Sequence, residues 1–133
     1  MDARALTPGE FIRAADFGVT LPKQPTWTLR RAGLEEMASM KPGAFDKMIE
    51  KGVVYFDEIK KGWVVNKTNV QLLTAMFGGE TDGWYGKRVT FHTVYQQGVK
   101  QDGILVLGSP DIREPIHTEV KLPRKRPIKV TLV

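Results

Sequence analysis

The stretch that decides the fold is Gly52-Val-Val-Tyr-Phe-Asp-Glu-Ile-Lys-Lys-Gly-Trp-Val-Val-Asn66. It holds two runs of β-branched and aromatic residues, Val53–Phe56 and Trp63–Val65, joined by a short turn that contains Gly62. Such runs around a glycine-containing turn predict an antiparallel hairpin. Because neighbouring side chains of a strand point to opposite faces, one of Tyr55 and Phe56 is expected in the core and the other at the surface.

The residues before this hairpin predict a strand and a short helix. Trp27 and Leu29 alternate with polar residues, so 26–37 is expected to be a first strand, with a bulge or bend at Gly33. Residues 7–15 begin with a T-P-x-E capping box, which predicts a short helix. Residues 38–50 are expected to form a loop with at most a turn of helix.

The residues after the hairpin predict one helix and two strands. Residues 67–77 have apolar residues on one helical face, a second capping box at Thr68 and Gln71, and a glycine pair as a stop. Residues 87–96 alternate and 104–107 are all apolar, which predicts two strands. The tail from residue 109 holds four prolines, which exclude a long helix, and 128–133 fits a terminal edge strand.

The order of elements is strand, hairpin, helix, strand, strand. It predicts a mainly β fold, namely a five-stranded barrel of the OB type with its helix between strands three and four. Another small barrel and an α+β roll have the same order and stay open as alternatives. The expected organisation is an N-terminal helix and lead-in (1–25), the barrel (26–108) and a proline-rich basic extension (109–133).

Composition bounds the function. The 133 residues include no cysteine and carry a formal net charge of +5. Disulfides and thiolate metal sites are therefore excluded, and polyanions are favoured as partners. The N-terminus has no apolar segment typical of a signal peptide, and no run is long enough to span a bilayer. We therefore expect a cytoplasmic protein that does not bind membranes.

Three short motifs carry a resemblance to a known family. They are Ala14-Ala15-Asp16, Val65-Asn66-Lys67-Thr68-Asn69, and Gly78 followed by Asp82-Gly83-Trp84-Tyr85-Gly86-Lys87-Arg88-Val89. Over residues 10–107 the chain resembles a family of small phage and prophage proteins that look like OB-fold single-stranded DNA-binding proteins. The resemblance implies a role near phage DNA replication or recombination and, if the chain is phage-encoded, a place in the host cytoplasm. The basic tail is not part of the pattern.

Single-strand binders combine cations that hold phosphates with aromatic rings on which bases stack. The candidate stacking residues are Tyr55, Trp63 and Trp84, although a domain of this size also needs large aromatic residues in its core. The candidate phosphate-binding residues are Arg30, Lys60, Lys61, Lys67, Lys87, Arg124, Lys125 and Arg126. Arg30 and Arg31 are neighbours in the first expected strand. One of them should therefore face solvent, and the other could lie at a sheet edge or bulge.

Several of these residues have a structural alternative. Thr68 caps the helix in one interpretation of N-K-T-N, whereas Lys67 and the helix N-terminus hold a phosphate in the other. Trp84 could cover the end of the barrel. The basic residues of the tail could bind nucleic acid, remain solvated, or protect an edge strand from aggregation.

Catalysis finds little support in the sequence. It contains no catalytic or metal-binding motif, and Asp57 and Glu58 diverge because they are adjacent in a strand. We therefore expect no enzyme activity and no cofactor. The leading hypothesis is a sequence-nonspecific single-stranded DNA-binding protein, with a replication or recombination protein and a second copy as further partners. The alternative is a protein-interaction module that recruits or inhibits a host or phage protein.

Overall fold

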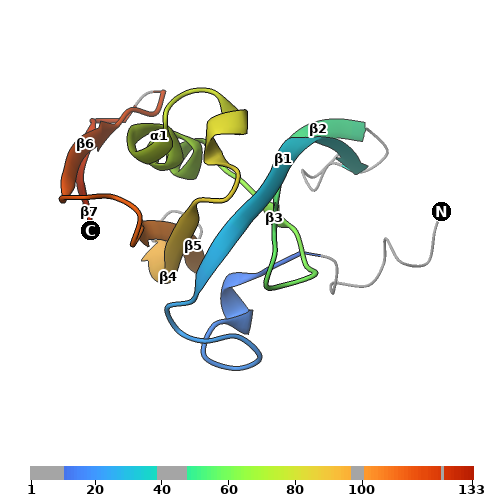
Figure 1. Cartoon of the computed structure of the whole chain (residues 1–133). Helices are drawn as coiled ribbons and strands as arrows, with labels where there is room; N and C mark the ends of the chain where they lie inside the picture. The colour runs from blue at the N-terminus through green and yellow to red at the C-terminus, as the bar shows by residue number, and fades with distance from the viewer. Residues whose placement is uncertain (1–10, 39–47, 97–100, 124) are drawn as a thin grey trace.

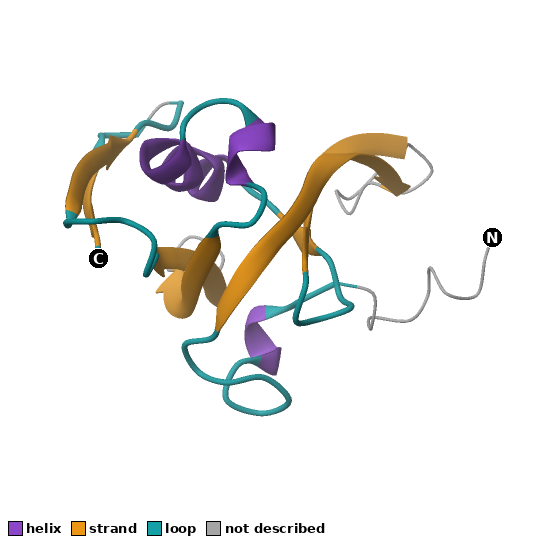
Figure 2. Ribbon diagram, in the orientation of Figure 1, coloured by secondary structure: helices purple, strands orange, loops and turns teal. Residues whose placement is uncertain are grey.

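A computed structural model describes residues 11–38, 48–96, 101–123 and 125–133 (Figure 1). The elements in chain order are η2 (Ala14–Asp16), β1 (Thr26–Ala38), β2 (Met48–Phe56), β3 (Trp63–Val64), α1 (Lys67–Phe77), η3 (Thr81–Trp84), β4 (Arg88–Gln96), β5 (Gln101–Gly108), β6 (Ile116–Val120) and β7 (Ile128–Leu132). Strands dominate, and α1 is the longest described helix (Figure 2). The predicted hairpin, the helix over 67–77 and the mainly β class are confirmed. Of the helix expected over 7–15, residues 7–10 lie outside the described residues, and in the rest only 14–15 are helical, as part of η2, so the prediction is wrong for 11–13. Of the loop expected over 38–50, residues 39–47 lie outside the described residues, whereas 38 and 48–50 belong to β1 and β2, so the prediction is wrong there.

The larger sheet has five strands in the order β3-β2-β1-β4-β5, and all the neighbouring pairs are antiparallel. β1 belongs to both halves of the sheet. Its residues Thr26–Thr28 pair with β4, whereas the residues from Leu29 onward pair with β2. The register shifts between Leu29 and Arg31, so the bulge lies at Arg30. The prediction of a bulge at Gly33 is wrong, because Gly33 pairs regularly with Val53.

The sheet is open: within the described residues, β3 and β5 are its two edges, and no strand pairing joins them. Other groups occupy the free edge of β5. The Asn69 side chain from α1 accepts a hydrogen bond from the Val106 N–H (2.9 Å) and donates one to the Ile104 carbonyl (2.9 Å). At the end of β5, the Val133 N–H bonds the Leu107 carbonyl, and the Val133 carbonyl accepts from Ser109. A side-chain amide and the chain end thus satisfy backbone groups that an adjacent strand would otherwise pair.

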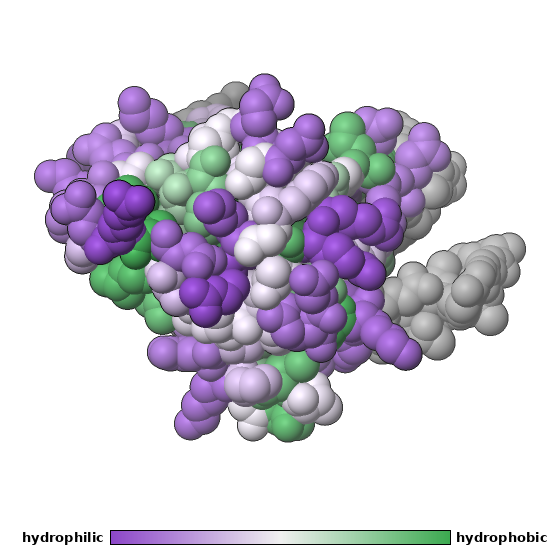
Figure 3. All heavy atoms as spheres, viewed as in Figure 1, coloured by the Kyte–Doolittle hydropathy of each residue, from purple (hydrophilic) through white to green (hydrophobic). Residues whose placement is uncertain are grey.

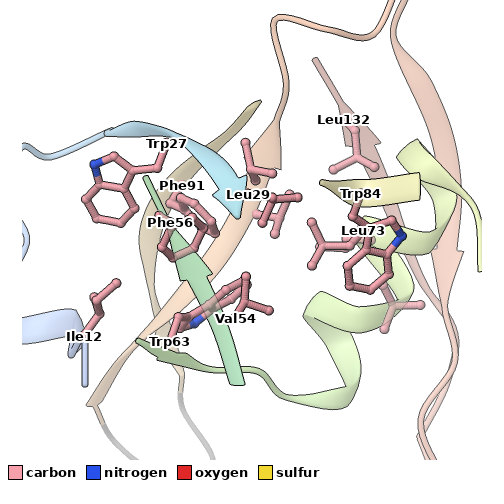
Figure 4. Close-up of a cluster of buried hydrophobic side chains, with 14 residues drawn as sticks. Ile12, Trp27, Leu29, Val54, Phe56, Trp63, Leu73, Trp84, Phe91 and Leu132 are labelled. Atoms are coloured by element: carbon pink, nitrogen blue, oxygen red, sulfur yellow. The ribbon is translucent and has the colours of Figure 1, made fainter. Parts of the chain in front are cut away.

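The core lies between the two halves of the sheet and under α1 (Figure 4). An aromatic cluster fills it, in which Trp63 packs edge-on against Phe91 with their ring centroids 4.8 Å apart. Phe56 contacts both rings, and Trp27 contacts Phe56 and Phe91. Alternation in β2 sends Phe56 into this cluster, which confirms that Tyr55 and Phe56 face opposite ways.

The start of α1 differs from the expected capping box. Asn66, not Thr68, is the N-cap, and its side-chain oxygen accepts from the Asn69 N–H at 2.9 Å. Gln71 does not reach back to the cap. It makes two hydrogen bonds with the backbone of Lys121, at 2.7 and 2.8 Å. The first and last asparagines of N-K-T-N therefore shape the fold: one begins the helix and the other fastens it to β5.

The C-terminal segment forms a second, two-stranded sheet that packs on α1 (Figure 1). β7 confirms the strand expected over 128–133, whereas β6 was not predicted. Val120 and Leu132 are buried against the core. The prolines at 115 and 127 stand just before β6 and β7, where they break no ladder hydrogen bond.

Candidate nucleic-acid interface

Two of the three proposed stacking residues belong to the core. Trp63 is 3% exposed and Trp84 is 5% exposed. The Trp84 indole N–H donates to the Gly78 carbonyl at 2.7 Å, which fixes the ring over the end of α1. A base could stack on either ring only if the core opened. The assignment of Trp63 and Trp84 as stacking platforms is therefore wrong, because both rings are buried in the core.

Tyr55 lies on the opposite face of β2, half-buried. The Arg31 guanidinium carbon lies 4.2 Å from the centroid of its ring, which is a cation–π geometry. The Tyr55 hydroxyl donates to the Glu35 carboxylate at 2.5 Å. Because Arg31 pairs with Tyr55 across the two strands, this contact follows directly from the register after the bulge. The Tyr55 ring is thus held between the Arg31 guanidinium and the Glu35 carboxylate.

Gly62 makes room for this ring. A Cβ added at Gly62 would lie 3.0 Å from both the Tyr55 ring and the Val53 side chain. The adjacent turn carries the two predicted lysines: Lys60 is exposed, and the Lys61 ammonium lies 3.7 Å from the Asp16 carboxylate. Asp16 ends the Ala14-Ala15-Asp16 turn, and its carboxylate also accepts from the Arg13 N–H. The A-A-D motif therefore holds the Lys61 ammonium next to the Asp16 carboxylate.

We call the surface formed by the outward-pointing residues of β1 and β2 the outer face. Its members are Arg31, Gly33 and Glu35 from β1, and Lys51 and Tyr55 from β2, whereas Val53 on the same side of β2 is buried beside Gly62. Sequence reasoning selected Tyr55 but not its partners Arg31 and Glu35. Alternation alone could not find them, because the extra residue at the bulge decides which arginine faces Tyr55.

The remaining predicted cations do not gather on the outer face. Arg30 is exposed at the bulge, Lys67 begins α1, and Lys87 adjoins the point where β4 meets β1. Lys125 and Arg126 are exposed in the connection between β6 and β7, on the other side of α1 from the β1–β2 ribbon (Figure 1). Arg124 lies outside the described residues. The predicted set therefore divides into a group near the outer face and a group on the C-terminal hairpin.

A cavity of about 520 Å³ lies between the two free edges of the sheet. Trp63 and Asn66 line it from the β3 side, Asp102 and Ile104 line it from β5, and the segment 12–15 covers it. The Ile12 N–H donates to the Gly62 carbonyl at 2.8 Å, so this segment follows the edge of the hairpin. The cavity therefore separates β3 from β5, and the N-terminal segment and Asn69 help to line it.

The described residues contain no cluster of three or more His, Cys, Asp or Glu side chains that could hold a metal ion. Glu58 binds the backbone N–H and the hydroxyl of Thr28, so it joins the turn to β1. Partial burial beside Phe17 and Lys23 lowers the pKa of His92. None of the helices in the described ranges is long and apolar enough to cross a membrane.

No protein-family model matches this chain, and neither a curated protein nor a solved structure matches it. Its function must therefore be inferred from its own geometry.

Proposed function

We propose that this chain is an OB-type domain that binds single-stranded DNA on its outer face, without strong sequence preference. The strand order and the position of α1 between β3 and β4 support the fold assignment, because an OB barrel has both features. The long β1, shared by the two halves and bent at Arg30, supports it further. Asn69 and the segment 12–15 stand where the third and fifth strands of such a barrel would meet.

The observation that carries the proposed function is the Arg31–Tyr55 pair. In OB folds the strands two and three are the usual surface for oligonucleotides, and β2 and β3 of this chain border the pair. A guanidinium that rests on an aromatic ring still has a planar face for a base and N–H donors for a phosphate. Arg31 is exposed, so both remain accessible. Tyr55 then acts mainly by holding Arg31 flat, rather than by stacking a base itself.

Nearby cations extend this site along a strand of nucleic acid. Lys60 and Lys61 belong to the β2–β3 turn whose Gly62 adjoins the Tyr55 ring, and Arg30 directly precedes Arg31 at the bulge. Lys61 keeps a defined position through Asp16. The Glu35 carboxylate repels phosphate. It accepts a hydrogen bond from the Tyr55 hydroxyl, however, and this bond fixes the position of the ring. The site is thus a short cationic track around one stacking unit, which suits binding without base-specific hydrogen bonds.

The experiment is fluorescence anisotropy with a labelled oligo-dT of about 30 nucleotides, competed by duplex DNA. Removing one stacking partner costs about 1–3 kcal/mol, so Arg31→Ala should weaken binding by roughly 5- to 150-fold. Arg31→Lys keeps the charge but loses the planar group, and should restore little. Lys125→Ala removes the same charge from the C-terminal hairpin and is the matched control. No binding of the wild type at low salt, or equal losses in Arg31→Ala and Lys125→Ala, would reject the proposal.

A protein-interaction module is the second candidate function. Val94 and Tyr95 are 41% and 57% exposed at the far end of β4. Neighbours in a strand point to opposite faces, so apolar groups meet solvent on both sides of this ribbon. A purified partner whose binding is lost in Tyr95→Ser, together with no affinity for oligo-dT, would favour this function instead.

A further inference from the structure

The edge of β1 that faces away from β2 is open beyond Leu29. On that side, Leu29 bonds the backbone of Gly86 and Lys87, each at 2.8 Å. From Arg30 onward, no described strand pairs with β1 on this side. The backbone N–H and C=O of Ala32 point to the open side, since the Tyr85 hydroxyl lies 3.4 and 3.3 Å from them. An unpaired edge of this length is a template for another strand.

The sequence along this edge is complementary to itself. Residues 30–36 are Arg-Arg-Ala-Gly-Leu-Glu-Glu, with two cations before the central Gly33 and two anions after it. In an antiparallel pair centred on Gly33, each Arg30 lies opposite Glu36 of the other copy. Each Arg31 likewise lies opposite Glu35 of that copy. Oppositely charged residues in directly opposed positions stabilise a strand pair.

The backbone allows this register. In an antiparallel ladder, a residue whose N–H and C=O point outward must face a residue of the same kind. Ala32 points outward, and alternation gives Leu34 and Glu36 the same direction. A two-fold axis at Gly33 therefore places Ala32 opposite Leu34 of the other copy, as a hydrogen-bonded pair. The backbone would also allow a two-fold axis at Ala32 or at Leu34. Neither position would place Arg30 opposite Glu36 or Arg31 opposite Glu35.

We propose that a second copy of this chain pairs with β1 through residues 30–36, in an antiparallel arrangement centred on Gly33. Leu34 is 72% exposed, and an apolar patch lies over the outer part of the β1–β2 ribbon, beside hydrophilic groups (Figure 3). Pairing covers each Leu34 side chain with the ribbon of the other copy. Gly33 has open space around its Cβ position, so nothing there keeps two strands apart.

Two neighbouring groups set the limits of the contact. Gly86 occupies the edge at Leu29, so the pairing ends where Arg30 meets Glu36 of the other copy. The Tyr85 hydroxyl must leave Ala32, and its contacts there are long ones that a backbone ladder replaces. Arg31 can keep its contact with the Tyr55 ring while its N–H groups donate to the Glu35 carboxylate of the other copy. The interface is short, so a weak and concentration-dependent dimer is expected.

The test uses two charge-reversed variants of the full chain and sedimentation velocity without DNA. The acidic variant carries Arg30→Glu and Arg31→Glu, and the basic variant carries Glu35→Arg and Glu36→Arg. Each alone should raise the dimer dissociation constant by at least about tenfold, because every opposed pair becomes repulsive. An equimolar mixture should dimerise at least as well as the wild type. The control Lys125→Glu with Arg126→Glu makes the same charge change on the C-terminal hairpin and should leave dimerisation unchanged.

A second measurement tests the register and does not depend on the charges. The chain has no cysteine, so Gly33→Cys introduces a single thiol that faces its own copy at the two-fold axis. Mild oxidation should link it rapidly into a covalent dimer, whereas the exposed Gly79→Cys should link slowly. A wild type that stays monomeric at high concentration, failure of the two variants to associate when mixed, or equal cross-linking at both positions would each overturn the proposal. All these readings are made without nucleic acid, so they stand or fall separately from DNA binding.

Discussion

Asn69 offers the sharpest test of how the open side of the sheet is stabilised. Its side chain is 1% exposed, and its amide satisfies one N–H and one C=O of β5 while also donating to Asn66 at 3.1 Å. Asn69→Ala leaves the Val106 N–H and the Ile104 carbonyl without these partners. A buried polar group that loses its partner costs about 1–3 kcal/mol. The better helix propensity of alanine returns roughly 0.5 kcal/mol.

Because two such groups lose their partner, the expected loss in the free energy of unfolding for Asn69→Ala is about 1.5–5.5 kcal/mol, a large part of the 5–15 kcal/mol typical of a domain. Urea unfolding followed by tryptophan fluorescence measures it, because Trp63 and Trp84 are buried and become exposed together. The matched control is Asn66→Ala, which removes the helix cap and should cost only about 1 kcal/mol. A loss below about 1 kcal/mol in Asn69→Ala, or no difference from Asn66→Ala, would refute the view that Asn69 replaces a strand contact.

Two further predictions concern the C-terminal part of β5 and the loop that follows. In Gly108→Ala the new Cβ would lie 1.9 Å from the Val133 carbonyl oxygen, so Val133 or the end of β5 must move. Thermal unfolding should therefore show a lower Tm, and an unchanged Tm would contradict this contact. Hydrogen bonds from the Arg88 side chain, and then from its backbone, hold the pKa of Asp111 below its ordinary value. Stability from this pair is therefore present above the unfolded pKa and is lost as the pH falls through the folded pKa. Asp111→Asn should flatten that acid dependence in a series of unfolding curves, and an unaltered pH profile would argue against the pair.

Local patterns were enough to predict most of the elements. Alternation at Trp27 and Leu29 located β1, and the glycine-containing turn before Trp63 located the hairpin. The apolar face located α1, and the glycine pair that follows it predicted its C-terminal end. These predictions succeeded because each depends on neighbouring residues and on the period of a helix or strand. β6 was not predicted because it is short and lies between prolines, which argue against regular structure.

The site was predicted less well, for reasons of long-range contact. Nothing in the residues around Trp63 distinguishes a ring that fills the core from one that covers a surface. The identity of the arginine that reaches Tyr55 depends on a single extra residue at Arg30, which shifts the register of the strand pair. The sequence offers two possible N-caps for α1, Asn66 and the capping box at Thr68, and local pattern does not distinguish them. The capping box does not form because Gln71 makes its hydrogen bonds with the backbone of the C-terminal hairpin instead.

The central claim is that single-stranded DNA binds on the outer face. The most direct test follows backbone amide resonances by NMR while oligo-dT is added to the ¹⁵N-labelled chain. The largest shifts are predicted for Arg31, Gly33, Tyr55 and Gly62, and they should weaken as salt rises because phosphate contacts release counterions. Shifts confined to the hairpin around Lys125, or no shifts at low salt, would contradict the claim.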